Sequence, residues 1–287
     1  SQDDSRLTMS GGSMTGNGTI DIDYIEFSGF STVAFTGDMN VKRFRNNMSL
    51  NLNLASHVTL EDSLLLTSGS LTLANGSNWT MESDAVIKVE GGSILLNGGI
   101  VTATNPYHVL YTGNTVTSGV ETTWAGMTNL TVSLADNSQN WRLGTDATIH
   151  GEVKHMKGWI DLNGNDLIIN GNYNNSSQAG FKGNASSSLM VNSTSNWTSD
   201  LMFESGSNNL DNLHVNMGDA TTLNLMSSLN INGDLVLGNG DLRIMNGASL
   251  TMEDGANVMV DKGGLTTSNG VFNGTNDYNV WYIGTAS

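Results

Sequence analysis

The stretch Tyr107-His108-Val109-Leu110-Tyr111-Thr112-Gly113 returns 171 positions later as Tyr278-Asn279-Val280-Trp281-Tyr282-Ile283-Gly284. The same offset lays Ala85 on Ala256 and Gly92 on Gly263. One constant offset that holds over tens of residues is an internal repeat, and a repeat determines architecture before any local motif does.

A half-shift divides the chain further. The phrase Asn129-Leu130-Thr131-Val132 falls 83 positions before Asn212-Leu213-His214-Val215. The unit is therefore about 83 to 88 residues long, and the chain holds about three degenerate copies. We divide it into a partial coil or cap (1–23) and three repeats (24–106, 107–200 and 201–287). The last repeat closes on the phrase that opens the second, so we expect a segment of a longer array, or a piece that is continued end to end.

The composition favours strands. Only 13% of the 287 residues are charged, there are 34 glycines, proline occurs once (Pro106), and cysteine is absent. Apolar residues interrupt the Gly, Asn, Ser and Thr positions at every second place, which supplies surface to bury and argues against disorder. Without disulfides, such a chain needs a large continuous core.

The charge excludes several partners. A formal net charge of -16 argues against nucleic acid, because phosphate binding needs Lys and Arg. It also argues against docking on an anionic bilayer. No run of 18 apolar residues is present, so we expect no membrane insertion. Acidic charge with few lysines suits a soluble extracellular protein.

The third copy consists of short segments in which apolar and polar residues alternate, and Asn-Gly and Gly-Gly pairs separate these segments. The strands that we expect there are Leu213–Met217, Leu223–Met226, Leu229–Ile231, Leu235–Leu237, Leu242–Met245, Leu250–Met252, Val258–Val260 and Val280–Ile283. A sandwich or a barrel would also contain such strands. Repetition favours an all-β, right-handed parallel β-helix, with three strands and about 22 to 25 residues per coil. Asn residues can then stack in ladders from coil to coil.

Chemistry-bearing motifs are few. The segment Asp161-x-Asn163-x-Asn165-Asp166 resembles the start of a calcium loop, but its sixth position is Asp166 instead of Gly. We favour a corner between the strands Trp159–Leu162 and Leu167–Ile169, and expect no cofactor beyond adventitious calcium. His150 and His155 are five apart, which places them on opposite faces of a strand-rich region and argues against a zinc site.

Two pairs of carboxylates raise the question of catalysis. Glu82 and Asp84 in the first copy recur as Glu253 and Asp254 in the third, and paired carboxylates can hydrolyse sugars. Because they recur with the repeat, we interpret them as solvated faces. A polysaccharide lyase would also need clustered cations, whereas the chain has one short basic cluster, Lys42-Arg43-x-Arg45. We therefore expect no catalytic residues.

Six tryptophans could stack on sugar rings. Alignment of the copies assigns Trp79, Trp159 and Trp281 to the core. Trp124 and Trp197 are less constrained and remain the candidates for ligand binding.

Several phrases resemble a known family. They are Val-x-Tyr-x-Gly (109–113 and 280–284), Asn-Leu-Thr-Val (129–132), Gly-x-Val (151–153) and the Leu- and Asn-rich stretch 160–167. These are similar to phrases in large secreted repeat proteins of Bacteroidetes, which are exported by the type IX secretion system and act as cell-surface adhesins, including gliding-motility adhesins. The resemblance implies an elongated β-rich surface protein and no catalytic residues; the family's C-terminal sorting domain is not visible in the sequence.

Three functions remain open from the sequence. The first is a secreted, non-catalytic adhesin or stalk segment whose partners are surface glycans or other cell-surface proteins, besides the secretion machinery. The second is a carbohydrate-active β-helix enzyme, either a polysaccharide lyase or a hydrolase. The third is a subunit of a self-assembling surface filament, which would associate end to end.

Overall fold

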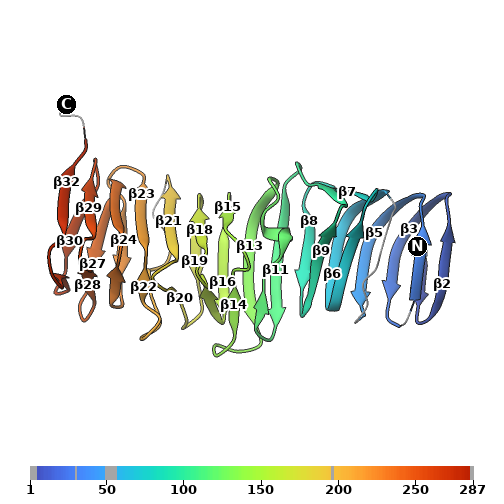
Figure 1. Cartoon of the computed structure of the whole chain (residues 1–287), viewed down its shortest axis with the longest axis horizontal. Coiled ribbons are helices and arrows are strands. Elements are labelled where there is room, and N and C mark those ends of the chain that lie inside the picture. The colour runs from blue at the N-terminus through green and yellow to red at the C-terminus, as the bar shows by residue number, and fades with distance from the viewer. Residues whose placement is uncertain (1–4, 30, 49–56, 195–196, 285–287) are drawn as a thin grey trace. The chain divides into compact units, whose positions relative to one another are not determined.

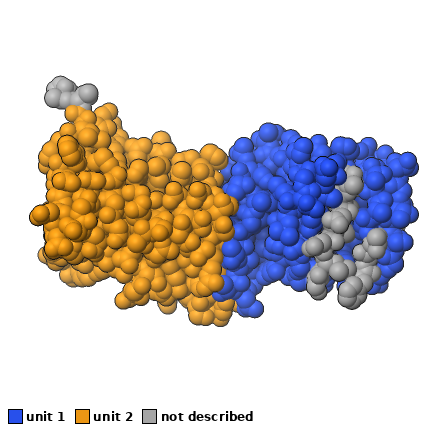
Figure 2. Space-filling view, in the orientation of Figure 1, with its two compact units in different colours: residues 1–133 blue, residues 134–287 orange. Residues whose placement is uncertain are grey.

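The computed structural model describes residues 5–29, 31–48, 57–194 and 197–284. It is a parallel β-solenoid, as the sequence predicts, in which each winding of the chain pairs with the next (Figure 1). The chain divides into two compact units, residues 1–133 and 134–287 (Figure 2). Among the described residues, no helix has the length and hydropathy needed to cross a membrane.

The first unit is built on one long sheet with the strand order β1-β3-β5-β6-β8-β11-β13. The remaining strands pair as β2-β4, β6-β7-β10 and β6-β9. The elements are β1 (Arg6–Met9), β2 (Gly12–Gly16), β3 (Thr19–Phe27), β4 (Ser31–Phe35), β5 (Asp38–Asn47), β6 (His57–Ala74), β7 (Asn78–Met81), β8 (Ala85–Val89), β9 (Gly92–Asn97), β10 (Ile100–Thr102), β11 (Tyr107–Gly113), β12 (Val116–Thr117), the 3-10 turn η1 (Val120–Thr122) and β13 (Met127–Leu134).

The second unit is built on a seven-stranded sheet with the order β15-β18-β21-β23-β26-β29-β32. Its other strands form the sheets β22-β25-β28-β31 and β24-β27-β30, with the pairings β14-β17-β20 and β16-β19. The elements are β14 (Asn140–Arg142), β15 (Ala147–Ile149), β16 (Val153–Lys157), β17 (Trp159–Asp161), β18 (Asp166–Ile169), β19 (Tyr173–Asn175), β20 (Phe181–Lys182), β21 (Ser188–Ser193), β22 (Asn209–Leu210), β23 (Asn212–Met217), β24 (Thr222–Leu225), β25 (Leu229–Ile231), β26 (Asp234–Asn239), β27 (Asp241–Ile244), β28 (Ser249–Met252), β29 (Asn257–Val260), β30 (Gly264–Thr267), β31 (Val271–Gly274) and β32 (Asn279–Tyr282).

Coil length follows from the register. Leu167 pairs with Leu189, and Leu189 pairs with Leu213, so these coils have the length that the sequence predicts. The first coils are shorter than predicted, since Arg6 already pairs with Tyr24. Inward side chains stack on one another from coil to coil, so that Leu167, Leu189 and Leu213 are fully buried. This stacking supplies the continuous core that a chain without disulfides requires.

The 171-residue repeat is present in the strand pairing. Val89 of β8 pairs with Tyr111 of β11, and their counterparts Val260 and Tyr282 pair in the same way between β29 and β32. Tyr111 is fully buried, whereas Tyr282, on the last described coil, is 82% exposed. The repeated sequence therefore determines which residues of neighbouring coils pair. Whether such a residue is buried depends on whether a further coil covers it.

Two buried polar clusters interrupt the apolar core. In the first unit, Tyr111 Oη and the Gly119 N–H both donate to Glu121 Oε1, at 2.5 and 2.7 Å, and Tyr107 Oη donates to the Glu121 backbone carbonyl at 2.7 Å. In the second unit, His155 Nδ1 lies 2.9 Å from Tyr173 Oη, and His155 Nε2 contacts the Gly158 carbonyl. His150 is exposed and His155 is buried, so the opposite faces predicted for this pair are confirmed.

Candidate functional site

The outer side of the seven-stranded sheet carries a row of mainly apolar side chains. In a strand, successive side chains point to opposite faces, so the residue between two buried ones must face outward. The register joins one such residue from each coil into a single row, which we call the central row: Ile168, Met190, His214, Val236, Met259 and Trp281. The first five are half-buried, and Trp281 is 57% exposed.

A row of polar side chains lies two residues before the central row. We call it the first ladder: Asp166, Ser188, Asn212, Asp234, Asn257 and Asn279. Asn212 Nδ2 donates to Ser188 Oγ at 3.2 Å, Asn257 Nδ2 to Asp234 Oδ1 at 2.8 Å, and Asn279 Nδ2 to Asn257 Oδ1 at 3.0 Å. The expected stacking of asparagines from coil to coil is confirmed.

A second polar row lies two residues after the central row. This second ladder consists of His150, Asn170, Asn192 and Asn216. Asn216 Nδ2 donates to Asn192 Oδ1 at 2.8 Å, and Asn192 Nδ2 donates to Asn170 Oδ1 at 3.0 Å. A bulge between Val215 and Asn216 shifts the register at this point, and Asn239 donates to Asp219 instead. The three rows together form a surface that we call the amide-flanked face.

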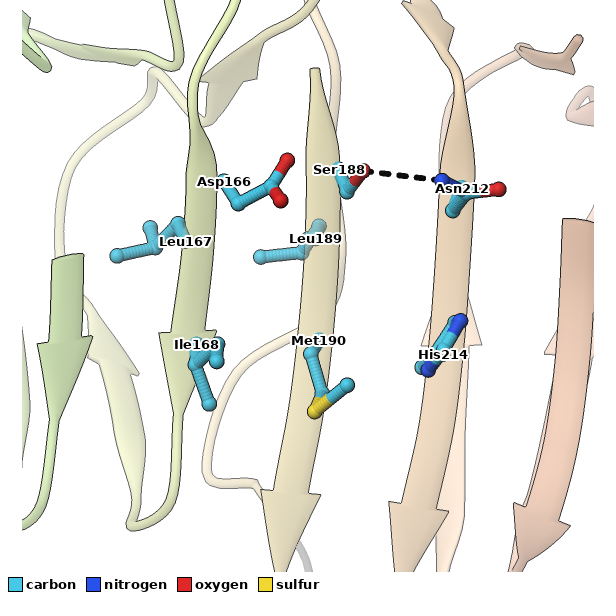
Figure 3. A pocket seen from close by; sticks show the side chains of 8 residues that line it. All are labelled: Asp166, Leu167, Ile168, Ser188, Leu189, Met190, Asn212 and His214. Carbon is cyan, nitrogen blue, oxygen red and sulfur yellow. Dashed lines mark hydrogen bonds between the residues drawn. The ribbon is translucent and has the colours of Figure 1, made fainter. Parts of the chain in front are cut away.

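The amide-flanked face is hollowed where the first ladder has its smallest side chain. Ser188 stands between Asp166 and Asn212, and the space that it leaves is a shallow hollow of about 150 Å³. Figure 3 shows Asp166, Ser188 and Asn212 in one row and Ile168, Met190 and His214 in the next, contributed by β18, β21 and β23. One hollow thus presents a carboxylate, a hydroxyl, an amide, an imidazole and two apolar side chains.

The charge of the amide-flanked face comes from its carboxylates and not from His214. Partial burial lowers the pKa of His214, while the carboxylates of Asp234 and Asp166 act in the opposite direction. His214 is therefore mainly neutral at pH 7, with one ring nitrogen that donates and one that accepts. The carboxylates Asp166 and Asp234 give the surrounding surface a negative charge.

The residues of the suspected calcium loop form a corner, as favoured from the sequence. Asn163 has a φ of 52°, and its N–H donates to Asp161 Oδ1 at 3.0 Å. The side-chain amides of Asn163 and Asn165 both donate to the Leu143 carbonyl of the preceding coil, at 3.0 and 2.9 Å. Arg142 Nε donates to Asp161 Oδ2 at 3.2 Å, and Asp166 belongs to the first ladder. In the described part of the chain, no group of three or more His, Asp or Glu residues could hold a metal ion.

The positions of the tryptophans agree only in part with the prediction. Trp197, a candidate for ligand binding, is 7% exposed; its ring centroid lies 4.9 Å from that of Tyr173, and its Nε1 donates to the Gly171 carbonyl. Trp124 is half-buried, with its ring 6.1 Å from Tyr107. Trp79 is buried as predicted, whereas the prediction of a core position is wrong for Trp159, which is half-exposed under Lys182, and for Trp281.

The charged residues that were considered for catalysis are the paired carboxylates and the basic cluster at 42–45, and they lie on different elements of the fold. Glu82 and Glu253 occupy equivalent corners, where the N–H of Ala85 donates to the Glu82 carbonyl and that of Ala256 to the Glu253 carbonyl. In the basic cluster, Lys42 pairs with Asp23, and Arg45 lies 3.6 Å from Glu26. The hydrogen bonds from Lys42 and Ser5 lower the pKa of Asp23 to about 2. Acidic neighbours thus engage Lys42 and Arg45, while the Arg43 guanidinium lies over the Tyr24 ring.

Sequence reasoning did not identify the central row, although a signal for it is present. Each member stands between two apolar residues, as Met190 stands between Leu189 and Val191, which breaks the expected alternation of apolar and polar residues. An apolar triplet that recurs once per coil therefore indicates an apolar outer row.

Comparisons with known proteins add no family. No protein-family model matches the chain, and neither a curated protein nor a solved structure matches it.

Proposed function

We propose that this chain is a secreted, non-catalytic adhesive or stalk element that acts at the cell surface through a repeated outer face. The observation that carries the proposal is the amide-flanked face, in which matched side chains recur once per coil over the seven-stranded sheet. A surface of this kind offers many equivalent contacts, each of them weak, and their number gives avidity.

Two further observations support an extracellular setting. The chain carries 27 acidic against 11 basic residues, which keeps a secreted protein soluble. Its phrases resemble those of Bacteroidetes surface adhesins exported by the type IX secretion system, and we propose the same route and location. Surface glycans and surface proteins are the proposed partners.

Adhesion and catalysis are separated by one experiment. Beads coated with the purified chain are applied to surfaces that carry polysaccharides, a mucin-type glycoprotein or matrix proteins, and the supernatant is assayed for reducing and unsaturated sugar products. We expect retention of the beads on at least one surface without product release. Release of sugar products would favour the carbohydrate-active enzyme. If the beads adhered to none of the surfaces, the adhesive role would be contradicted.

A further inference from the structure

The central row is an apolar surface that the fold leaves outside the core. Ile168, Met190, Val236 and Met259 are aligned by parallel pairing, and adjacent paired strands lie about 4.8 Å apart. A flat ligand that repeats along its length can therefore contact one side chain per coil. Trp281 adds an exposed aromatic ring to the same row, and aromatic rings pack on apolar ligand faces.

The two ladders supply hydrogen bonds of both kinds along the row. A side-chain amide has two N–H donors and two acceptor lone pairs. Within a ladder, Asn192 uses one donor towards Asn170 and one lone pair towards Asn216. Asn192 therefore keeps one N–H and one lone pair, which match a hydroxyl group that both accepts and donates. Asn212 donates to Ser188 and to Asp211 and accepts from the Asp234 N–H, so it keeps one lone pair for a ligand hydroxyl. The face thus combines an apolar centre with edges suited to hydroxyls.

The charge of the face restricts the ligand further. Asp166 and Asp234 lie in the first ladder, and the chain has a formal net charge of -16. An anionic polymer would meet like charges on this face. An extended peptide is also disfavoured at the hollow, because strand addition needs an open edge, whereas β18, β21 and β23 are each paired on both sides.

We propose that the amide-flanked face binds a neutral polysaccharide along the central row, with one sugar ring seated in the hollow at Ser188. The apolar ring face contacts Ile168 and Met190, and the hydroxyl groups bond to Asp166, Ser188 and neutral His214. This inference rests on the proposed adhesive function and names its ligand class.

Two variants of the full chain test the site. Met190→Asp replaces an apolar contact by a charge, and Ser188→Tyr fills the hollow with a residue that suits a strand. Thr251→Asp is the matched control, because Thr251 is a half-exposed position on β28, outside the seven-stranded sheet. Circular dichroism and thermal midpoints are measured first, to check that all three variants fold as the parent does.

The probes are cellulose, a soluble neutral β-glucan, a neutral galactan and polygalacturonate, with the bound fraction measured by pull-down and affinity electrophoresis. We expect the parent chain to bind a neutral probe and to ignore polygalacturonate. Both test variants should lose at least tenfold in affinity, and Thr251→Asp should retain the parent affinity.

The proposal is overturned if no neutral probe binds, if polygalacturonate binds preferentially, or if Met190→Asp binds as the parent does. Adhesion to proteins or to anionic surfaces in the bead experiment, together with any of these results, would leave the adhesive function standing and remove the ligand assigned to it.

Discussion

At the scale of single side chains, burial decides the ionisation of the few polar groups inside the core. Glu121 and His155 are both almost inaccessible to water and have opposite protonation preferences. Burial disfavours the charged form of each, so the acid holds its proton more tightly and the base holds its proton less tightly. Their pH dependences therefore have opposite signs.

Burial raises the pKa of Glu121, against the opposing hydrogen bonds from Tyr111 and Gly119. The folded state binds the proton more tightly than the unfolded chain, so the free energy of unfolding falls as the pH rises above about 4.5. We expect Glu121→Gln to be more stable than the parent at pH 8, by about 1 kcal/mol, in urea unfolding. The difference should shrink towards pH 4, and parallel pH profiles would contradict this account.

Burial lowers the pKa of His155 from 6.5 to about 4. Between these two values the unfolded chain binds more protons, so the free energy of unfolding falls as the pH is lowered and levels off below about 4. The loss is at most about 3 kcal/mol. In His155→Gln the slope between pH 6.5 and 4 should be reduced, whereas the same change at exposed His57 should leave it as in the parent.

At the scale of elements, the alternation of apolar residues made most strands predictable. All eight strands expected in the third copy are present, with boundaries within two residues. Three strands of this copy were missed, namely β22, β30 and β31. The strand β22 has only two residues, and Gly264–Thr267 and Val271–Gly274 contain few apolar residues. Trp281 was misplaced because its counterpart in the alignment of the copies, Leu110, was taken for a core residue. Leu110 is half-buried between the buried Val109 and Tyr111, so the period of two assigns both positions to the outer face.

The ladders make a testable contribution to the sheet. Asn192 accepts from Asn216 and donates to Asn170, so Asn192→Ala breaks two bonds that link three coils. Each such bond contributes about 0.5–1.5 kcal/mol, and exposure places these two at the low end. We expect a loss of about 1 kcal/mol in urea unfolding. Asn246→Ala, at an exposed turn, should change stability by less than half of that, and equal losses would argue against the ladder.

At the scale of the whole chain, charge opposes the compact state. The imbalance of 27 acidic against 11 basic residues produces self-repulsion, which added salt screens. Raising NaCl from about 10 mM to about 150 mM shortens the Debye length from about 30 Å to about 8 Å. We expect the thermal midpoint to rise, and CaCl₂ at equal ionic strength to do the same. A fall would contradict the repulsion, and a much larger rise with CaCl₂ would indicate calcium binding.

Repetition explains which parts of the candidate site could be foreseen. The sequence predicted solenoid coils and stacked asparagines, because both follow from the spacing of residue types along the chain. The hollow at Ser188 could not be predicted, since it depends on which ladder positions the register brings together. That register changes with coil length, which is shorter between Arg6 and Tyr24 than between Leu189 and Leu213.

Parallel pairing of consecutive windings also has a mechanical consequence. A force that pulls the two ends of the molecule apart acts first on the outermost winding. The windings should therefore unfold one at a time, starting from an end. Release of a winding such as that from Leu167 to Leu189 lengthens the tether by roughly 70 Å, at about 3.3 Å per extended residue. Optical-tweezer traces should therefore show a regular saw-tooth of about that step. In the proposed adhesive role, this stepwise lengthening would let an attached cell yield gradually under drag.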